Sequence, residues 1–271
     1  MKLIHALKLP LKYLFIGFIS IFFTGFFVCF LLSPIVPYTP TDENFIALIN
    51  IGSKIMTLYI YMRLLRNETE DLNTILKINK LSSKNIIIIT IFAIAFTFCK
   101  SLLGSTSLTL INTFTTYTGY NKIISSAQSS LNCYLALFNL IIIGPIFEEI
   151  LLRGMIFNSL KKNLNIVAAI ILQAFIFSIL HGNIIQCIYT FASGIIYGVI
   201  YLKTNSLLAP ILMHIIGNFV GTVGMNFVSN NLHDYIRIID CSSILIAIVS
   251  FIWIMRINSN NKSKCTLSIK E

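Results

Sequence analysis

Eight long apolar segments limit what this chain can fold into. A helix needs about 20 mostly apolar residues to cross a bilayer, and backbone amides cannot stay unpaired in lipid. The sequence therefore predicts an all-α fold, a polytopic membrane protein of about eight transmembrane helices. The expected segments are 13–36, 45–64, 85–103, 132–160, 165–182, 184–202, 207–228 and 237–256.

Composition and charge exclude other classes of protein. Hydrophobic residues make up 56% of the chain and charged residues 11%, whereas soluble domains usually contain about 25% charged residues. The net charge of +10 does not come from a basic stripe with interleaved aromatic residues, so we expect no nucleic-acid partner. The expected surroundings are a lipid bilayer.

The positions of Lys and Arg predict the orientation. With the N-terminus in the cytoplasm, sixteen of the 20 Lys and Arg residues fall on the inner side. Only Lys100, Lys122 and Arg237 fall on the outer side. The remaining lysine, Lys54, weakens the second apolar segment from within. This asymmetry follows the positive-inside rule, so we expect a multi-pass protein of the cell membrane with both termini cytoplasmic.

The first apolar run follows Lys2, Lys8 and Lys12. It is longer than the apolar core of a signal peptide and has no small-x-small cleavage site. We therefore expect an uncleaved first helix that begins near residue 13.

Charge inside the fourth segment is informative, because ionisable residues at membrane depth are costly and usually functional. Glu149 and Arg153 are four residues apart with the acid first, which predicts an intrahelical ion pair. Glu148 lies about 100° round the helix and lacks that partner. An unpaired carboxylate in apolar surroundings can act as a base. The alternative is that these residues mark a helix end at the lipid headgroups.

Further polar residues follow in the next apolar segments. His181 ends the run that begins at Phe177, and alone it also fits an ordinary interfacial histidine. His214 and Asn218 are four residues apart and share a helix face, although an interhelical hydrogen bond would explain them as well. Five glycines are expected to allow close helix packing: Gly194, Gly198, Gly217, Gly221 and Gly224.

Membrane depth relates these residues to one another. An antiparallel hairpin that turns at 161–165 brings Glu148 level with His181, both about 25 Å from the turn. Counted from Ser206, His214 lies only about 12 Å from the inner surface. A tilted or shortened helix is needed to bring His214 to the same depth.

At these residues the sequence resembles the CAAX protease and bacteriocin-processing family of intramembrane proteases. The family pattern is Glu-Glu-x-x-x-Arg, then Phe-x-x-x-His, then His-x-x-x-Asn. The residues that match it, in order, are Glu148, Glu149, Arg153, Phe177, His181, His214 and Asn218. They lie on expected helices four to seven, while the other helices match only in being hydrophobic.

The resemblance implies an intramembrane endopeptidase whose substrates are peptides or proteins in or at the membrane. It implies that Glu148 and His181 activate water and that His214 and Asn218 stabilise the oxyanion. Glu149, Arg153 and Phe177 would support them. Chemistry permits these roles, since a carboxylate and an imidazole can deprotonate water, and Asn and His can donate to negative charge.

Two alternatives remain open in the sequence: whether the reaction uses zinc, and whether the protein is catalytic at all. Members of the family are often labelled metalloproteases, and Glu148, His181 and His214 could supply three zinc ligands with an open position. The sequence lacks HExxH, and Glu plus His suffices without metal, so we expect no required cofactor. A non-catalytic or regulatory membrane protein, such as a bacteriocin self-immunity factor, is the alternative function. The absence of a detectable repeat argues against a transporter.

We expect three parts in the chain. Residues 1–131 hold helices one to three and an outer loop rich in Ser, Thr and Asn. Residues 132–228 hold a four-helix catalytic core. Residues 229–271 hold the last membrane helix and a cytoplasmic tail.

Overall fold

The structure is a computed structural model that describes residues 2–32, 43–66, 72–106, 134–182, 184–232 and 235–257. Every regular element within these ranges is a helix, as the sequence predicts. Most of the expected outer loop and cytoplasmic tail lies outside them. The first elements are α1 (Lys2–Leu32), α2 (Glu43–Arg66), α3 (Leu72–Leu76) and α4 (Ser83–Thr106). The last are α10 (Ile166–Ile179), α11 (Ile184–Thr204) and α14 (Ile236–Met255).

Two continuous helices are interrupted by π-helical turns. The longer one consists of α7 (Tyr134–Phe138), η3 (Asn139–Ile143), α8 (Gly144–Glu149), η4 (Ile150–Phe157) and α9 (Asn158–Leu160). The other consists of α12 (Leu208–Phe219), η5 (Val220–Gly224) and α13 (Met225–Asn231). π-Helical turns are frequent at functional sites, and the apolar pattern did not predict them here.

The chain is a multi-pass membrane protein. Six of the described helices are long and apolar enough to cross a membrane, and two apolar helices, Ile166–Ile179 and Leu208–Gly224, are shorter. The expectation of about eight full spans is therefore corrected to six candidate spans and two shorter helices. The 14 residues of α10 rise only about 21 Å, less than the roughly 30 Å of a hydrocarbon core.

Local chemistry explains the short length of α10. Asn165 caps its beginning, where its side chain accepts a hydrogen bond from the Ala168 amide. Gly182 follows its end with a φ of 67°, a conformation that glycine adopts without steric cost. The predicted segment 165–182 includes both of these helix-ending residues, which is why it was too long.

The first helix begins at Lys2 rather than near residue 13. Ala6, Pro10 and Tyr13 are all buried, and their spacing of four and three residues places them on one face. That part of α1 contacts η4 and α9, while Lys8 is exposed on the other side. The basic residues that were expected ahead of the helix are therefore part of it.

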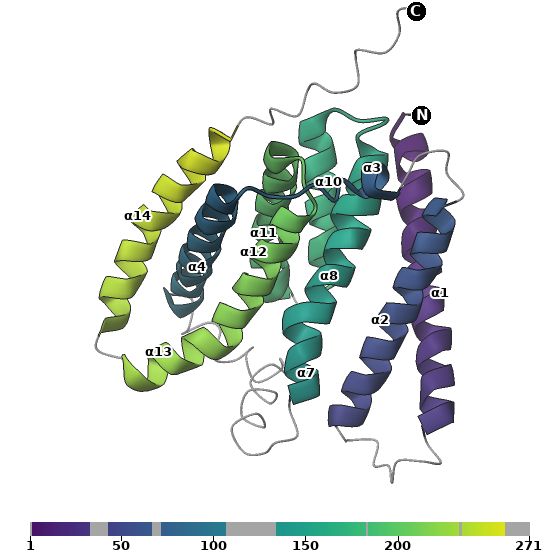
Figure 1. Ribbon diagram of the computed structural model, residues 1–271, viewed down its shortest axis with the longest axis horizontal. Coiled ribbons are helices and arrows are strands. Elements are labelled where there is room, and N and C mark those ends of the chain that lie inside the picture. The colour runs from purple at the N-terminus through teal and green to yellow at the C-terminus, as the bar shows by residue number, and fades with distance from the viewer. Residues whose placement is uncertain are drawn as a thin grey trace, which may run out of the picture.

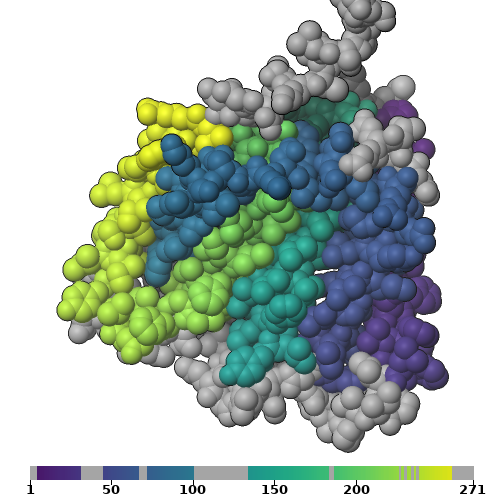
Figure 2. Space-filling view, viewed as in Figure 1, coloured from purple at the N-terminus to yellow at the C-terminus, as the bar shows by residue number. Residues whose placement is uncertain are grey.

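The helices lie side by side, with α1 and α2 at one edge of the molecule and α4 and α14 at the other (Figure 1). The long helix that contains α8 lies between them, next to α12. The beginning of α1 and the end of α14 lie at the same end of the molecule (Figure 1). Narrow openings separate α2 from α7 and α8 in the space-filling view (Figure 2).

Two groups of buried apolar side chains stabilise this arrangement. One includes Tyr61, Phe147 and Phe177 and joins α1, α2 and the α8–η4 region to α10. The other includes Tyr197 and Met213 and joins α4, α11, α12 and α14. The polar residues singled out in the sequence lie where these two groups meet. Large apolar side chains on α1 and α14 remain exposed, as surfaces that face lipid require.

Candidate active site

A buried ion pair lies at the centre of the polar cluster. Arg153 Nη1 donates to Glu149 Oε1 at 2.9 Å, and both side chains are fully buried. This is the pair that the i, i+4 spacing predicts. The guanidinium also lies 4.9 Å from the Phe177 ring centroid and 5.2 Å from that of Tyr197. Arg153 Nη2 donates to the Gly194 carbonyl oxygen at 3.3 Å. Two aromatic faces, a carboxylate and a carbonyl thus replace water around the cation.

His214 shares this carboxylate. Its Nδ1 lies 2.9 Å from Glu149 Oε1, and its Nε2 lies 3.8 Å from Glu148 Oε2. Because the Glu149 carboxylate can only accept, Nδ1 carries the proton. The i, i+4 spacing predicted Arg153 as the partner of Glu149, and it did not predict this second contact. Spacing within one helix carries no information on contacts made by a side chain of another helix.

The start of α12 explains how His214 reaches this depth. The turn before it is covered by the segment between α3 and α4: the Leu207 amide donates to the Lys77 carbonyl at 2.9 Å. Ser206 Oγ donates to the Asn79 carbonyl at 2.5 Å, and Ser206 is fully buried. The helix therefore starts inside the molecule. Counting residues from Ser206 placed His214 at a different depth from Glu148 and His181, and the buried start of α12 accounts for this difference.

His181 lies in the turn after α10. Its Nδ1 donates to the Phe177 carbonyl oxygen at 2.9 Å, which leaves Nε2 with a lone pair in the neutral ring. The Phe177 ring meets the His181 ring edge to face at 4.8 Å and the His214 ring at 5.9 Å. Phe177 therefore contacts both imidazoles and the Arg153 guanidinium.

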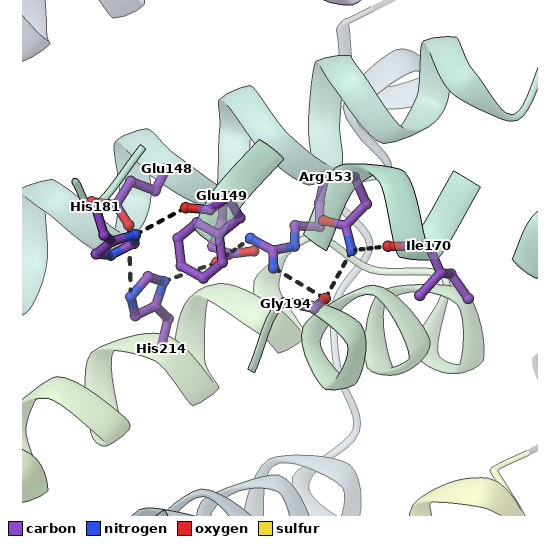
Figure 3. A network of polar contacts seen from close by, with 9 residues as sticks. Glu148, Glu149, Arg153, Ile170, His181, Gly194 and His214 are labelled. Atoms are coloured by element: carbon purple, nitrogen blue, oxygen red, sulfur yellow. Dashed lines mark hydrogen bonds and ion pairs between the residues drawn. The ribbon is translucent and has the colours of Figure 1, made fainter. Parts of the chain in front are cut away.

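Glu148 faces both imidazoles. Figure 3 shows its side chain and the rings of His181 and His214 converging on one place, with Glu149 and then Arg153 to their right. The Glu148 side chain is 33% exposed, whereas Glu149 is fully buried. Their adjacent positions in α8 give one carboxylate an open face and the other a closed one, which is the division that the sequence predicts.

Asn218 lies one helical turn beyond His214. Its Nδ2 donates to the Leu140 carbonyl oxygen in η3 at 2.9 Å. One of its two amide hydrogens is thus bound to the backbone of the neighbouring helix. The structure brings Glu148, His181 and His214 together and attaches Asn218 to the π-helical turn beside them.

Lys54 is a further charged residue near the site. It lies on α2, and its Nζ donates to Asn139 Oδ1 at 2.9 Å. It also interacts electrostatically with Glu148. In the sequence, Lys54 stands out only as a charge that weakens an apolar segment. Its charge at membrane depth was the available signal, but nothing in the sequence placed α2 beside α8.

Glu148, His181 and His214 are the residues that could supply zinc ligands. Among the residues that the structure describes, no three His, Cys, Asp or Glu side chains are grouped so that they could hold a metal ion. The Nδ1 hydrogen bonds of His181 and His214 leave Nε2 as the nitrogen that each neutral ring could offer a metal. As placed, these side chains do not form a three-ligand zinc site.

Comparisons with known proteins converge on this region. A family model described as type II CAAX prenyl endopeptidase Rce1-like matches residues 130–220, a range that includes all seven predicted site residues. No solved structure matches the chain.

Two bacterial relatives are similar over part of their length. The proposed membrane peptidase YdiL of Bacillus subtilis (strain 168) is 32% identical over 94 residues, 34% of this chain and 38% of YdiL. The membrane-embedded CAAX protease MroQ of Staphylococcus aureus (strain USA300) is 35% identical over 89 residues, 30% of this chain and 36% of MroQ. The chain thus aligns with less than two fifths of either relative.

Proposed function

We propose that this chain, which resembles Rce1-like type II CAAX prenyl endopeptidases through residues 130–220, is an intramembrane endopeptidase. The observation that carries the proposal is the convergence of Glu148, His181 and His214 beside a second, buried carboxylate (Figure 3). Ionisable groups at membrane depth are costly and usually functional. Here they form an acid–base cluster with one open carboxylate.

In the proposed reaction, Glu148 removes a proton from a water molecule whose oxygen attacks the peptide carbonyl carbon. His181 orients this water, because the Phe177 carbonyl holds its Nδ1 proton and leaves the Nε2 lone pair free to accept. When the C–N bond breaks, the proton held by Glu148 passes to the leaving nitrogen. One water molecule is consumed for each peptide bond.

The oxygen of the tetrahedral intermediate needs donors about 2.7–3.1 Å away. His214 supplies Nε2–H in its imidazolium form, since its Nδ1–H is bound to Glu149. The negative charge of Glu149 then stabilises the imidazolium. Asn218 would contribute the amide hydrogen that its bond to Leu140 leaves free.

The proposed substrates are peptides or proteins in or at the membrane, and the proposed orientation places both termini in the cytoplasm. No metal or other cofactor is required in this mechanism, with zinc as the alternative. A non-catalytic role, such as a bacteriocin self-immunity factor, remains the alternative function. It predicts that the acid–base residues can be replaced without loss of the biological effect.

Substitution of the acid–base residues tests the proposal. Peptides released by cells that contain the wild-type protein, Glu148→Gln or His181→Ala are compared by mass spectrometry, and the peptides that differ are then offered to purified protein. His5→Ala is the matched control, since His5 is exposed on α1. Loss of cleavage in both site variants at normal protein levels, with activity kept in the control, supports an endopeptidase. Undiminished cleavage by Glu148→Gln overturns the mechanism.

A further inference from the structure

A lysine within a membrane-spanning helix faces the candidate site. Lys54 lies in α2, within the candidate span Phe45–Arg66, and an ammonium group at membrane depth is costly without partners. Asn139 Oδ1 accepts one of its hydrogen bonds at 2.9 Å. Asn139 is the first residue of the π-helical turn η3, so the anchor for Lys54 is part of the irregular helix that also carries Glu148.

Gly144 leaves open the space between the two charges. A Cβ at Gly144 would lie 3.6 Å from Lys54 Nζ and 3.8 Å from Glu148 Oε1. The ammonium and this carboxylate oxygen therefore border the same small volume. The other carboxylate oxygen, Oε2, faces His214 Nε2 at 3.8 Å. Glu148 thus lies between a cation on one side and an imidazole on the other.

The charges of the cluster are balanced while both histidines are neutral, before His214 takes up the proton that its proposed oxyanion contact requires. Arg153 is hydrogen-bonded to Glu149, and both are fully buried. The positive charge of Lys54 then balances the negative charge of Glu148, with which it interacts electrostatically. If Lys54 is removed, the Glu148 carboxylate no longer has a cation to balance it, in surroundings where charges are weakly screened.

We propose that Lys54 is a positioning residue that holds the Glu148 carboxylate in its reactive orientation across the space beside Gly144. Its link to α8 crosses a boundary with narrow openings (Figure 2), where Tyr61 of α2 also stacks on Phe147 of α8 at 6.2 Å between ring centroids. The expected effect of Lys54 on kcat rests on the proposed function. Lys54 lies outside residues 130–220, the range that the family model matches.

Kinetics of three variants test the catalytic consequence. Lys54→Gln removes the charge but keeps a donor for Asn139, and Lys54→Arg keeps the charge. Gly144→Ala keeps every charge but adds a methyl group 3.0 Å from the Asn139 carbonyl oxygen and in ordinary contact with Lys54 Nζ and Glu148 Oε1. We expect kcat to fall about tenfold to a hundredfold in Lys54→Gln, as for misplaced catalytic groups, and less in Gly144→Ala. KM should change little, and Lys54→Arg should recover part of kcat. Lys12→Gln, on an exposed part of α1, is the matched control. An unchanged kcat in Lys54→Gln overturns the proposal.

A double-mutant cycle measures the electrostatic coupling of Lys54 and Glu148 without any cleavage assay. Thermal midpoints of Lys54→Gln, Glu148→Gln and the double variant are compared in detergent. We expect each single change to lower Tm and the double variant to be no less stable than either, because both charges are then removed together. Strictly additive losses overturn this coupling. If the wild type cleaves no peptide yet the cycle is non-additive, the proposed function fails while the Lys54–Glu148 interaction stands.

Discussion

Glu149 Oε1 accepts a 2.9 Å hydrogen bond from His214 Nδ1, although 65 residues separate the two along the chain. The same oxygen accepts from Arg153. Glu149 therefore does more than neutralise a neighbouring cation, because it also fixes which nitrogen of His214 carries a proton. The two adjacent glutamates consequently differ in what their loss should do.

We predict that Glu149→Gln destabilises the protein more than Glu148→Gln. The first change leaves the buried Arg153 without its counter-charge, which costs about 3–5 kcal/mol. The second affects a side chain that is one third exposed, and should cost about 1 kcal/mol or less. Thermal unfolding of both purified variants in detergent measures the difference. Equal midpoints would contradict the division between a structural and a reactive carboxylate.

Phe177→Leu is predicted to impair both stability and activity. The ring lies against Arg153, His181 and His214, so its loss removes packing and a cation–π contact worth about 1–2 kcal/mol. Cleavage should fall about tenfold because both imidazoles lose a neighbour that orients them. Phe175→Leu is the control, since Phe175 is 52% exposed on the same helix. Similar effects of the two changes would argue against a specific role of Phe177.

Gly194→Ala is predicted to disrupt the packing of α10 on α11. A Cβ at Gly194 would lie 2.9 Å from both Cα and Cβ of Ala174, so the two helices must separate, at a cost of about 1–3 kcal/mol. A Cβ at Gly224 would meet only Val220 of its own helix, at 3.4 Å or more. Gly224→Ala should therefore leave Tm nearly unchanged. A harmless Gly194→Ala would show that the helices can move apart freely.

Much of the fold could be predicted because lipid leaves few choices for the backbone. Each of the eight apolar runs is a helix, and Glu149 and Arg153 pair as their spacing predicts. Some helix ends could not be predicted as well, because contacts far along the chain determine them. The burial of Ser206 by the segment around Asn79 is one example, and the packing of the first turns of α1 is another.

The sequence predicted which residues belong to the site, but it did not predict which partner each of them contacts. Spacing within a helix indicated the face that His214 and Asn218 share. It gave no information on which neighbour each would bind: His214 binds Glu149, and Asn218 binds the Leu140 carbonyl. Lys54 was missed as a neighbour of Glu148 because one lysine in an apolar run does not reveal which helix lies beside it.

Removal of metal is predicted to leave the activity intact. The mechanism needs only Glu148 and His181 to activate water, and the described residues provide no three-ligand group. Protein dialysed against EDTA should cleave at an unchanged rate and contain far less than one zinc per chain by elemental analysis. Loss of activity on chelation, with recovery in step with one bound zinc, would overturn the metal-free mechanism.

The orientation is predicted from charge and can be tested at two exposed residues. Lys162 follows α9 and Asn231 ends α13, at opposite ends of the molecule (Figure 1). In a cysteine-free background, a cysteine in place of Lys162 should react with a membrane-impermeant reagent only in opened cells. One in place of Asn231 should react in intact cells. Reaction of both from one side would contradict the predicted topology.

The π-helical turn η3 holds one residue more than an α-helical turn would. The Gly144 amide bonds back to Asn139, five residues earlier rather than the four of an α-helix. The helix takes up this extra residue within one turn, so the part before it keeps nearly the same rotation relative to α8. Deleting one residue there would restore α-helical geometry and change the backbone that presents Asn139 to Lys54 and the Leu140 carbonyl to Asn218. A homologous sequence that lacks this residue should therefore lack these two contacts as well.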